Sequence, residues 1–132
     1  MKFLKLNILF IVVLFSACSS GPGSQELHKE VMNFHDEVMP YMGSLYKAEK
    51  KVGSMIAELD STATGEKKVL QAQLDSLVKA QDHMNEWMRG FKTAYQKDMS
   101  EAEKVIVLKD QLKKVKSLST ELEAAKKIAD SL

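Results

Sequence analysis

Three long stretches of this sequence repeat apolar residues at alternating intervals of three and four. The repeat runs from Leu27 to Leu59, from Leu70 to Tyr95, and from Val105 to Leu132. On an α-helix this spacing places the apolar side chains on one stripe, which has to be buried against other helices. The chain is therefore predicted to be all-α.

Two breaks in the repeat divide the chain into three predicted helices, at about 25–60, 65–97 and 100–131. Residues 61–65 are turn formers, and Ser100 with Glu103 has the spacing of a capping box. Short connections make successive helices run in opposite directions. This predicts an antiparallel three-helix bundle with coiled-coil-like seams. A long hairpin that dimerises into a larger bundle is the alternative.

A proline interrupts the first apolar stripe. Pro40 has no backbone N–H, so the carbonyl of Asp36 loses its helical partner. Met39, the residue before it, is biased away from helical backbone angles. The first helix is therefore predicted to be kinked near Pro40.

The N-terminal residues have the composition of a cleavable secretion signal. Lys2 and Lys5 supply a positive region, and residues 8–15 form an apolar run. This run is shorter than the roughly 20 residues that a membrane-spanning helix needs. Residues 15–18, with the sequence FSAC, resemble a lipobox, in which cleavage precedes a lipid-modified cysteine. The alternative is an ordinary secretory signal followed by a chance cysteine.

These features divide the chain into a lipoprotein signal peptide over 1–17, a lipidated Cys18 with a flexible tether over 18–24, and a bundle over 25–132. The tether residues are polar and rich in Gly and Pro. Two or more acyl chains, such as palmitate, hold a protein stably on a membrane. We expect a membrane-anchored lipoprotein of the bacterial cell envelope, facing the periplasm.

The charge of the chain is nearly balanced, with 19 basic and 18 acidic side chains. Arg89 is the single arginine, although arginine is the residue best suited to binding phosphate. Neither feature provides the basic surface that nucleic acid requires. We expect no nucleic-acid partner. The expected partners are the membrane, through the lipid, and an envelope protein or a second copy of the chain.

Methionine and histidine are concentrated in two segments that folding is expected to bring to one level of the bundle. Antiparallel pairing about residues 62–63 places His35 opposite Gly90, Val38 opposite Trp87, and Tyr41 opposite Met84. Thioether and imidazole groups suit Cu(I). The candidate ligands of such a soft-metal site are His35, Met39, Met84 and Met88.

The simpler interpretation of this level is core packing, because methionine fills irregular gaps and packs well against aromatic rings. On that interpretation no cofactor is needed. Arg89 would then form an ordinary ion pair with Asp36 or Glu37, which lie at its level.

The sequence lacks four motifs that are typical of metal-dependent, phosphate-binding and hydrolytic catalytic sites. The residues three positions before the histidines are not glutamates, so the Glu-x-x-His pattern of di-iron bundles is missing. His-Glu-x-x-His, a Gly-rich phosphate loop and Gly-x-Ser-x-Gly are also missing. We expect a non-enzymatic module that binds a partner or acts as a structural spacer, with periplasmic soft-metal binding as the alternative.

Three segments resemble a family of small bacterial lipoproteins to which no activity is assigned. They are HKEVM at 28–32, HDEVMPYM at 35–42 and WMRGF at 87–91. Members of that family are sometimes labelled "viral A-type inclusion protein". The resemblance implies a lipoprotein with a helical bundle, and it implies no activity.

Overall fold

The computed structural model describes residues 21–132, and four α-helices contain most of them. The helices are α1 (Ser24–Val38), α2 (Tyr41–Glu58), α3 (Thr64–Ala94) and α4 (Glu101–Ser131). Residues 21–132 contain no strand. The prediction of an all-α chain is therefore confirmed for this range. The predicted signal peptide and Cys18 lie outside the described residues.

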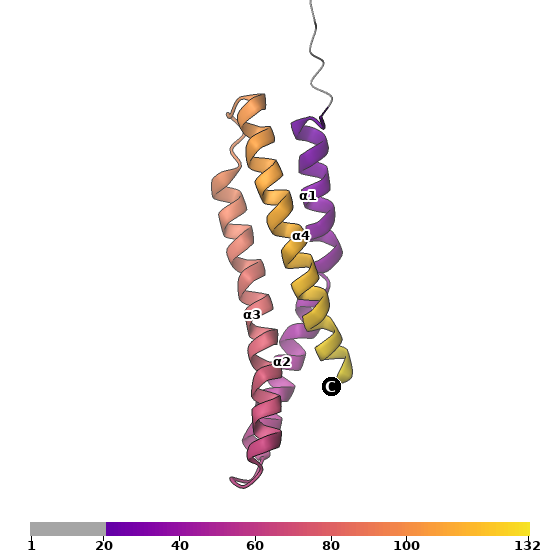
Figure 1. Cartoon of the computed structure of the whole chain (residues 1–132), viewed down its shortest axis with the longest axis vertical. Helices are drawn as coiled ribbons and strands as arrows, with labels where there is room; N and C mark the ends of the chain where they lie inside the picture. Colours follow the sequence, from indigo (N-terminus) through magenta and orange to yellow (C-terminus); the bar gives the residue numbers. More distant parts are fainter. Residues whose placement is uncertain (1–20) are drawn as a thin grey trace, which may run out of the picture.

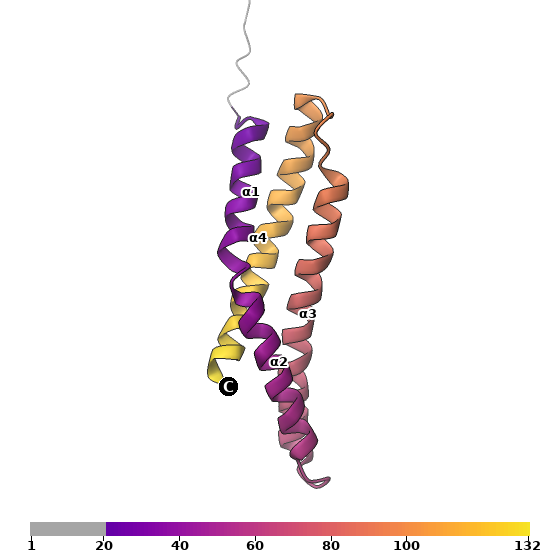
Figure 2. The ribbon, with the colours of Figure 1, turned by 180° about the vertical axis from the view of Figure 1, so that it is seen from behind.

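The helices pack lengthwise into a bundle (Figure 1). α1 and α2 follow one another along one side, α3 returns along their length, and α4 doubles back again. α1 packs mainly against α4, whereas α2 packs against both α3 and α4. The view from behind shows that α4 ends before the turn between α2 and α3 (Figure 2). The α2–α3 hairpin therefore extends beyond the end of α4.

The predicted kink at residues 39–40 is confirmed as a break between two helices. α1 ends at Val38 and α2 begins at Tyr41. The expectation that Met39 leaves helical angles was wrong, because its φ of −55° and ψ of −38° are those of a right-handed helix. The Met39 N–H still donates to the carbonyl of His35 at 2.9 Å, which holds the chain close to the helical path.

The apolar stripes predicted from the sequence form the core. A lower core cluster joins α2, α3 and α4 with Val38 at the end of α1. An upper core cluster joins α1 to α4 through Leu27, Val31, Leu108 and Val115. The fully buried side chains include Val31, Val38, Leu45, Val52, Leu77, Met84, Leu108, Val115 and Leu122. Each leucine of this size contributes roughly 1.5–3 kcal/mol on burial. Trp87 packs against both clusters and so connects the two halves of the bundle.

The start of α4 is fixed by the predicted capping box. The Glu103 N–H donates to the Ser100 hydroxyl at 3.3 Å, and the Ser100 N–H donates to the Glu103 carboxylate at 2.8 Å. The prediction from the Ser/Glu spacing is confirmed. No helix within residues 21–132 is long and apolar enough to cross a membrane.

Candidate functional site

Three aromatic side chains form a ladder along one face of α3, the last of them on Tyr95, the residue that follows the helix. Trp87, Phe91 and Tyr95 are spaced four residues apart, so they lie above one another on the helix. The ring centroids of Trp87 and Phe91 are 5.3 Å apart, and those of Phe91 and Tyr95 are 5.7 Å apart. Both pairs are stacked at separations typical of attractive aromatic contacts. We call these three residues the aromatic ladder.

Two histidines of α1 pack against the aromatic ladder. The ring of His35 lies 5.8 Å from Trp87, and the ring of His28 lies 5.1 Å from Tyr95. His28 and His35 are two helical turns apart, which matches the length of the ladder. α1 lies mainly against α4, so its backbone does not approach α3 closely. The contact between α1 and the aromatic ladder is therefore made by these histidine rings.

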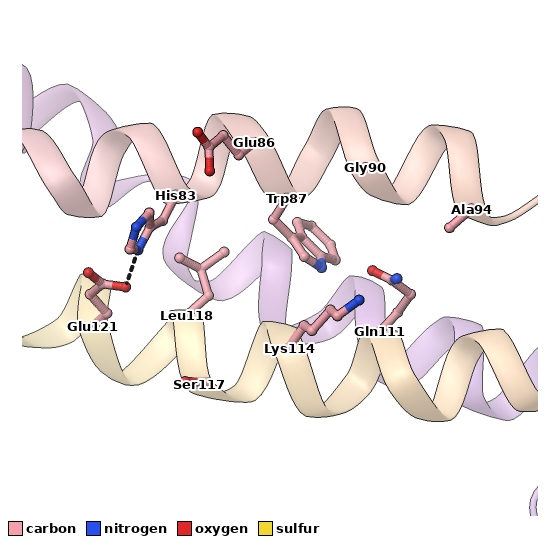
Figure 3. A pocket seen from close by; sticks show the side chains of 10 residues that line it. All are labelled: His83, Glu86, Trp87, Gly90, Ala94, Gln111, Lys114, Ser117, Leu118 and Glu121. Carbon is pink, nitrogen blue, oxygen red and sulfur yellow. Dashed lines mark hydrogen bonds and ion pairs between the residues drawn. The ribbon is translucent and has the colours of Figure 1, made fainter.

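Trp87, at one end of the ladder, also lines a groove between α3 and α4 with a volume of about 510 Å³. The groove and its side chains are shown in Figure 3. Its lining residues are His83, Glu86, Trp87, Gly90 and Ala94 of α3, and Gln111, Lys114, Ser117, Leu118 and Glu121 of α4. The volume lies within the range of about 300–1,000 Å³ that small-molecule sites occupy.

Small residues give this groove its width. Gly90 and Ala94 are one turn apart on α3, and a Cβ atom placed on Gly90 would meet nothing within 4 Å. Glycine inside a helix costs about 1 kcal/mol relative to alanine. The glycine is therefore not required by close packing, and its effect is to leave the wall of the groove open.

One end of the groove is closed by a hydrogen-bonded pair of side chains from the two helices. His83 Nδ1 lies 2.8 Å from the Glu121 carboxylate, as the dashed line in Figure 3 shows. Glu86 also lines this end. Further along α4, Lys114 lies 2.6 Å from its neighbour Asp110.

Two buried polar groups face each other across the middle of the groove. Trp87 Nε1 is shielded from solvent and donates to no group in the described structure. Gln111 is only 5% exposed, and its amide nitrogen has one long contact, of 3.4 Å, to Asp110. Figure 3 shows the indole nitrogen pointing toward the α4 wall, where Gln111 lies. Native proteins rarely leave such groups without a partner.

The four residues predicted as soft-metal ligands are divided between two environments. Met84 is fully buried in the lower core cluster, and Met39 and Met88 pack against that cluster. His35 lies against Trp87, with its Nδ1 2.8 Å from the Asp36 carboxylate. No group of three or more His, Cys, Asp or Glu side chains in residues 21–132 is arranged to hold a metal ion.

The structure does not contain the predicted ion pair of Arg89. Arg89 is exposed on α3 and forms no ion pair with Asp36 or Glu37 in the described range. Asp36 instead contacts His35, its neighbour on α1. The pairing of the helices explains the difference: α1 lies mainly on α4, so its acidic face is not directed at α3.

Comparisons with protein-family models, with curated proteins and with solved structures found no match. The resemblance to a lipoprotein family therefore remains a prediction from the three segments that carry it.

Proposed function

We propose that this chain is a lipid-anchored, non-enzymatic helical module of the bacterial cell envelope that faces the periplasm. The proposal rests first on residues 1–18, where a positive region, an apolar run and Cys18 have the order of a lipoprotein signal. In this proposal residues 1–17 are removed and Cys18 carries the lipid. The module binds a partner or acts as a spacer.

The observation that carries this proposal is the position of Ser24, the first residue of α1, at one end of the bundle (Figure 1). Five residues separate it from Cys18, so the two positions lie at most about 20 Å apart at full extension. α3 alone, with 31 residues, is about 46 Å long. A lipid on Cys18 would therefore hold a rod by its end, with the α2–α3 turn at the far end.

We further propose that the molecule is an antiparallel three-helix bundle in which Pro40 causes the break between α1 and α2. Supporting the first point, each described helix buries its apolar face against other helices of the same chain. This arrangement favours the bundle over a hairpin that needs a second copy. Supporting the second point, a proline removes a helical hydrogen bond at that position.

The groove between α3 and α4 favours binding over a purely structural role. It combines apolar lining residues with Trp87 Nε1, a buried donor that has no partner in the described residues. A binding site of this kind needs no catalytic group. The module would present the groove along the side of the rod.

Soft-metal binding remains the alternative function. Its specific support is that Met39, Met84 and Met88 all belong to or pack against one cluster of side chains. Thioether sulfur is a ligand that Cu(I) prefers. His35 would have to complete the ligand set from beside Trp87.

Metabolic labelling with a fatty-acid analogue tests the anchor. The full chain should become labelled and sediment with membranes, whereas Cys18→Ser should lose both properties, because Cys18 is the single cysteine. Ser19→Ala is the matched control and should label like the parent. Undiminished labelling of Cys18→Ser would contradict the proposal.

A further inference from the structure

The groove between α3 and α4 contains polar groups whose chemistry defines what it can bind. Trp87 Nε1 is a donor without an acceptor, and the carboxamide of Gln111 can both donate and accept. A buried donor without a partner costs about 1–3 kcal/mol. A ligand with a neutral acceptor and donor side by side would satisfy both groups. A peptide bond has this pair.

The charges of the groove oppose an anionic ligand. Glu86 and Glu121 carry negative charge at one end, where His83 Nδ1 lies 2.8 Å from the Glu121 carboxylate. Lys114 is the single lysine in the lining, and the exposed Asp110 lies 2.6 Å from it. The acidic end is thus complementary to a cation, and a carboxylate at Lys114 would have to compete with Asp110.

The floor of the groove accommodates an apolar side chain. Gly90 and Ala94 leave space on α3 beside the ring of Trp87, and Leu118 lines the groove further along α4, toward His83 (Figure 3). A volume of about 510 Å³ suits a ligand of a few residues rather than a folded partner.

We propose that this groove binds a short peptide segment in which an apolar residue adjoins a lysine or arginine. A backbone carbonyl accepts from Trp87 Nε1, and the neighbouring N–H donates to Gln111. The apolar side chain covers Gly90, and the cationic side chain lies against the exposed carboxylate of Glu86, one helical turn away. This inference rests on the proposed binding role of the module and specifies its ligand.

The single tryptophan of the chain makes the test direct. We would label the full chain with ¹⁵N-tryptophan in nonionic detergent and follow its one indole N–H signal by NMR. The probes are Ac-Leu-Lys-NH2 and its acidic counterpart Ac-Leu-Glu-NH2. We expect a saturable shift of the indole signal with the basic peptide and at least about tenfold weaker binding of the acidic one, a difference of about 1.4 kcal/mol.

Two variants locate the binding. Gly90→Leu should fill the groove and weaken binding of the basic peptide about tenfold. Gly43→Leu is its control, because Gly43 is also an exposed helical glycine with open space around it. Glu86→Gln should weaken the basic peptide and leave the acidic one unchanged or slightly improved. Glu123→Gln, on α4 outside the groove, should change neither.

Three results would overturn the inference. They are no saturable shift with the basic peptide, equal affinity for the two peptides, and unchanged binding in both Gly90→Leu and Glu86→Gln. The first would show that a peptide of this kind does not reach Trp87 Nε1. None of them affects lipid labelling of Cys18, so this inference can fail while the proposed anchoring holds. If Gly90→Leu does not fold, Glu86→Gln still decides the question.

Discussion

The carboxylate of Glu101, in the first turn of α4, accepts hydrogen bonds from both the backbone N–H and the hydroxyl of Ser24, each at 2.8 Å. Ser24 is the first residue of α1, whose N-cap, Gly23, has no side chain to cap the helix. Glu101 therefore caps α1 from another helix, and its negative charge lies near the positive ends of two helix dipoles. These bonds hold the pKa of Glu101 below its ordinary value of 4.5.

This contact predicts a loss of stability in acid. Because its pKa is lowered on folding, Glu101 stabilises the folded state fully above pH 4.5, and the contribution disappears as pH falls through the folded pKa. Hydrogen bonds from Ser100 and Thr62 lower the pKa of Glu103 and Asp60 in the same way. Thermal unfolding followed by circular dichroism should therefore show a Tm that falls below pH 4.5.

The variant Glu101→Gln separates this contact from the general effect of acid. It should have a lower Tm than the parent at neutral pH, and the difference should shrink as the parent's Glu101 becomes protonated. Glu123→Gln, an exposed position on the same helix, is the control and should match the parent. A Tm difference that does not depend on pH would rule out the charge of Glu101 as the cause.

The structure of the core predicts that truncating Leu77 will cost much more unfolding free energy than truncating Ile106. Leu77 is fully buried in the lower core cluster, so Leu77→Ala should reduce the free energy of unfolding by about 2–5 kcal/mol. Ile106 is 70% exposed, so Ile106→Ala should change it by no more than about 0.5 kcal/mol. Urea denaturation measures both. Equal losses in the two variants would mean that the helices pack in another register.

Pro40 can be tested as the cause of the break between α1 and α2. Met39 and Pro40 already have helical backbone angles, so alanine fits at position 40 without strain. Pro40→Ala should supply a donor for the Asp36 carbonyl, raise the Tm and protect the new amide from hydrogen exchange. If that amide exchanges freely, the packing of α1 on α4, rather than the proline, sets the break.

The methionines distinguish core packing from metal binding. Met84 is fully buried, so Met84→Leu should change stability by less than about 1.5 kcal/mol, because the two side chains have similar volumes. Met39→Leu should likewise change stability by less than about 1.5 kcal/mol. We expect no saturable Cu(I) binding in a competition titration of the parent. Tight one-to-one binding that Met84→Leu abolishes would instead establish the metal site.

The apolar periodicity predicted most of the fold because its physical cause is local. Leu45, Leu77 and Leu122 are buried where the three-and-four spacing places them. Gln81 also falls in this spacing and is buried, but the spacing could not predict that Gln111 and Ser119 are buried too. A polar side chain is buried only when its neighbours on other helices leave room or bond to it, and a single stripe does not contain that information.

The candidate site was harder to predict because it depends on which helices are neighbours. Antiparallel pairing placed His35 opposite Gly90, whereas its ring lies against Trp87, three residues earlier and within one turn. The groove was missed altogether. Its walls come from α3 and α4, and the pair His83 and Glu121 has no signal in either helix alone.

The packing of α1 on α4 has a consequence for the order in which this chain can assemble. Ser24 and Glu101 are 77 positions apart, so α1 has to wait for almost the whole chain before it finds its partner. The α2–α3 hairpin, by contrast, joins neighbours in the sequence and can form early. A mechanical load applied through residues 21–23 would enter at Ser24 and peel α1 from α4 first. The end of the molecule that would carry such a load is thus held by contacts between residues far apart in the sequence, while the hairpin beyond it can stay folded.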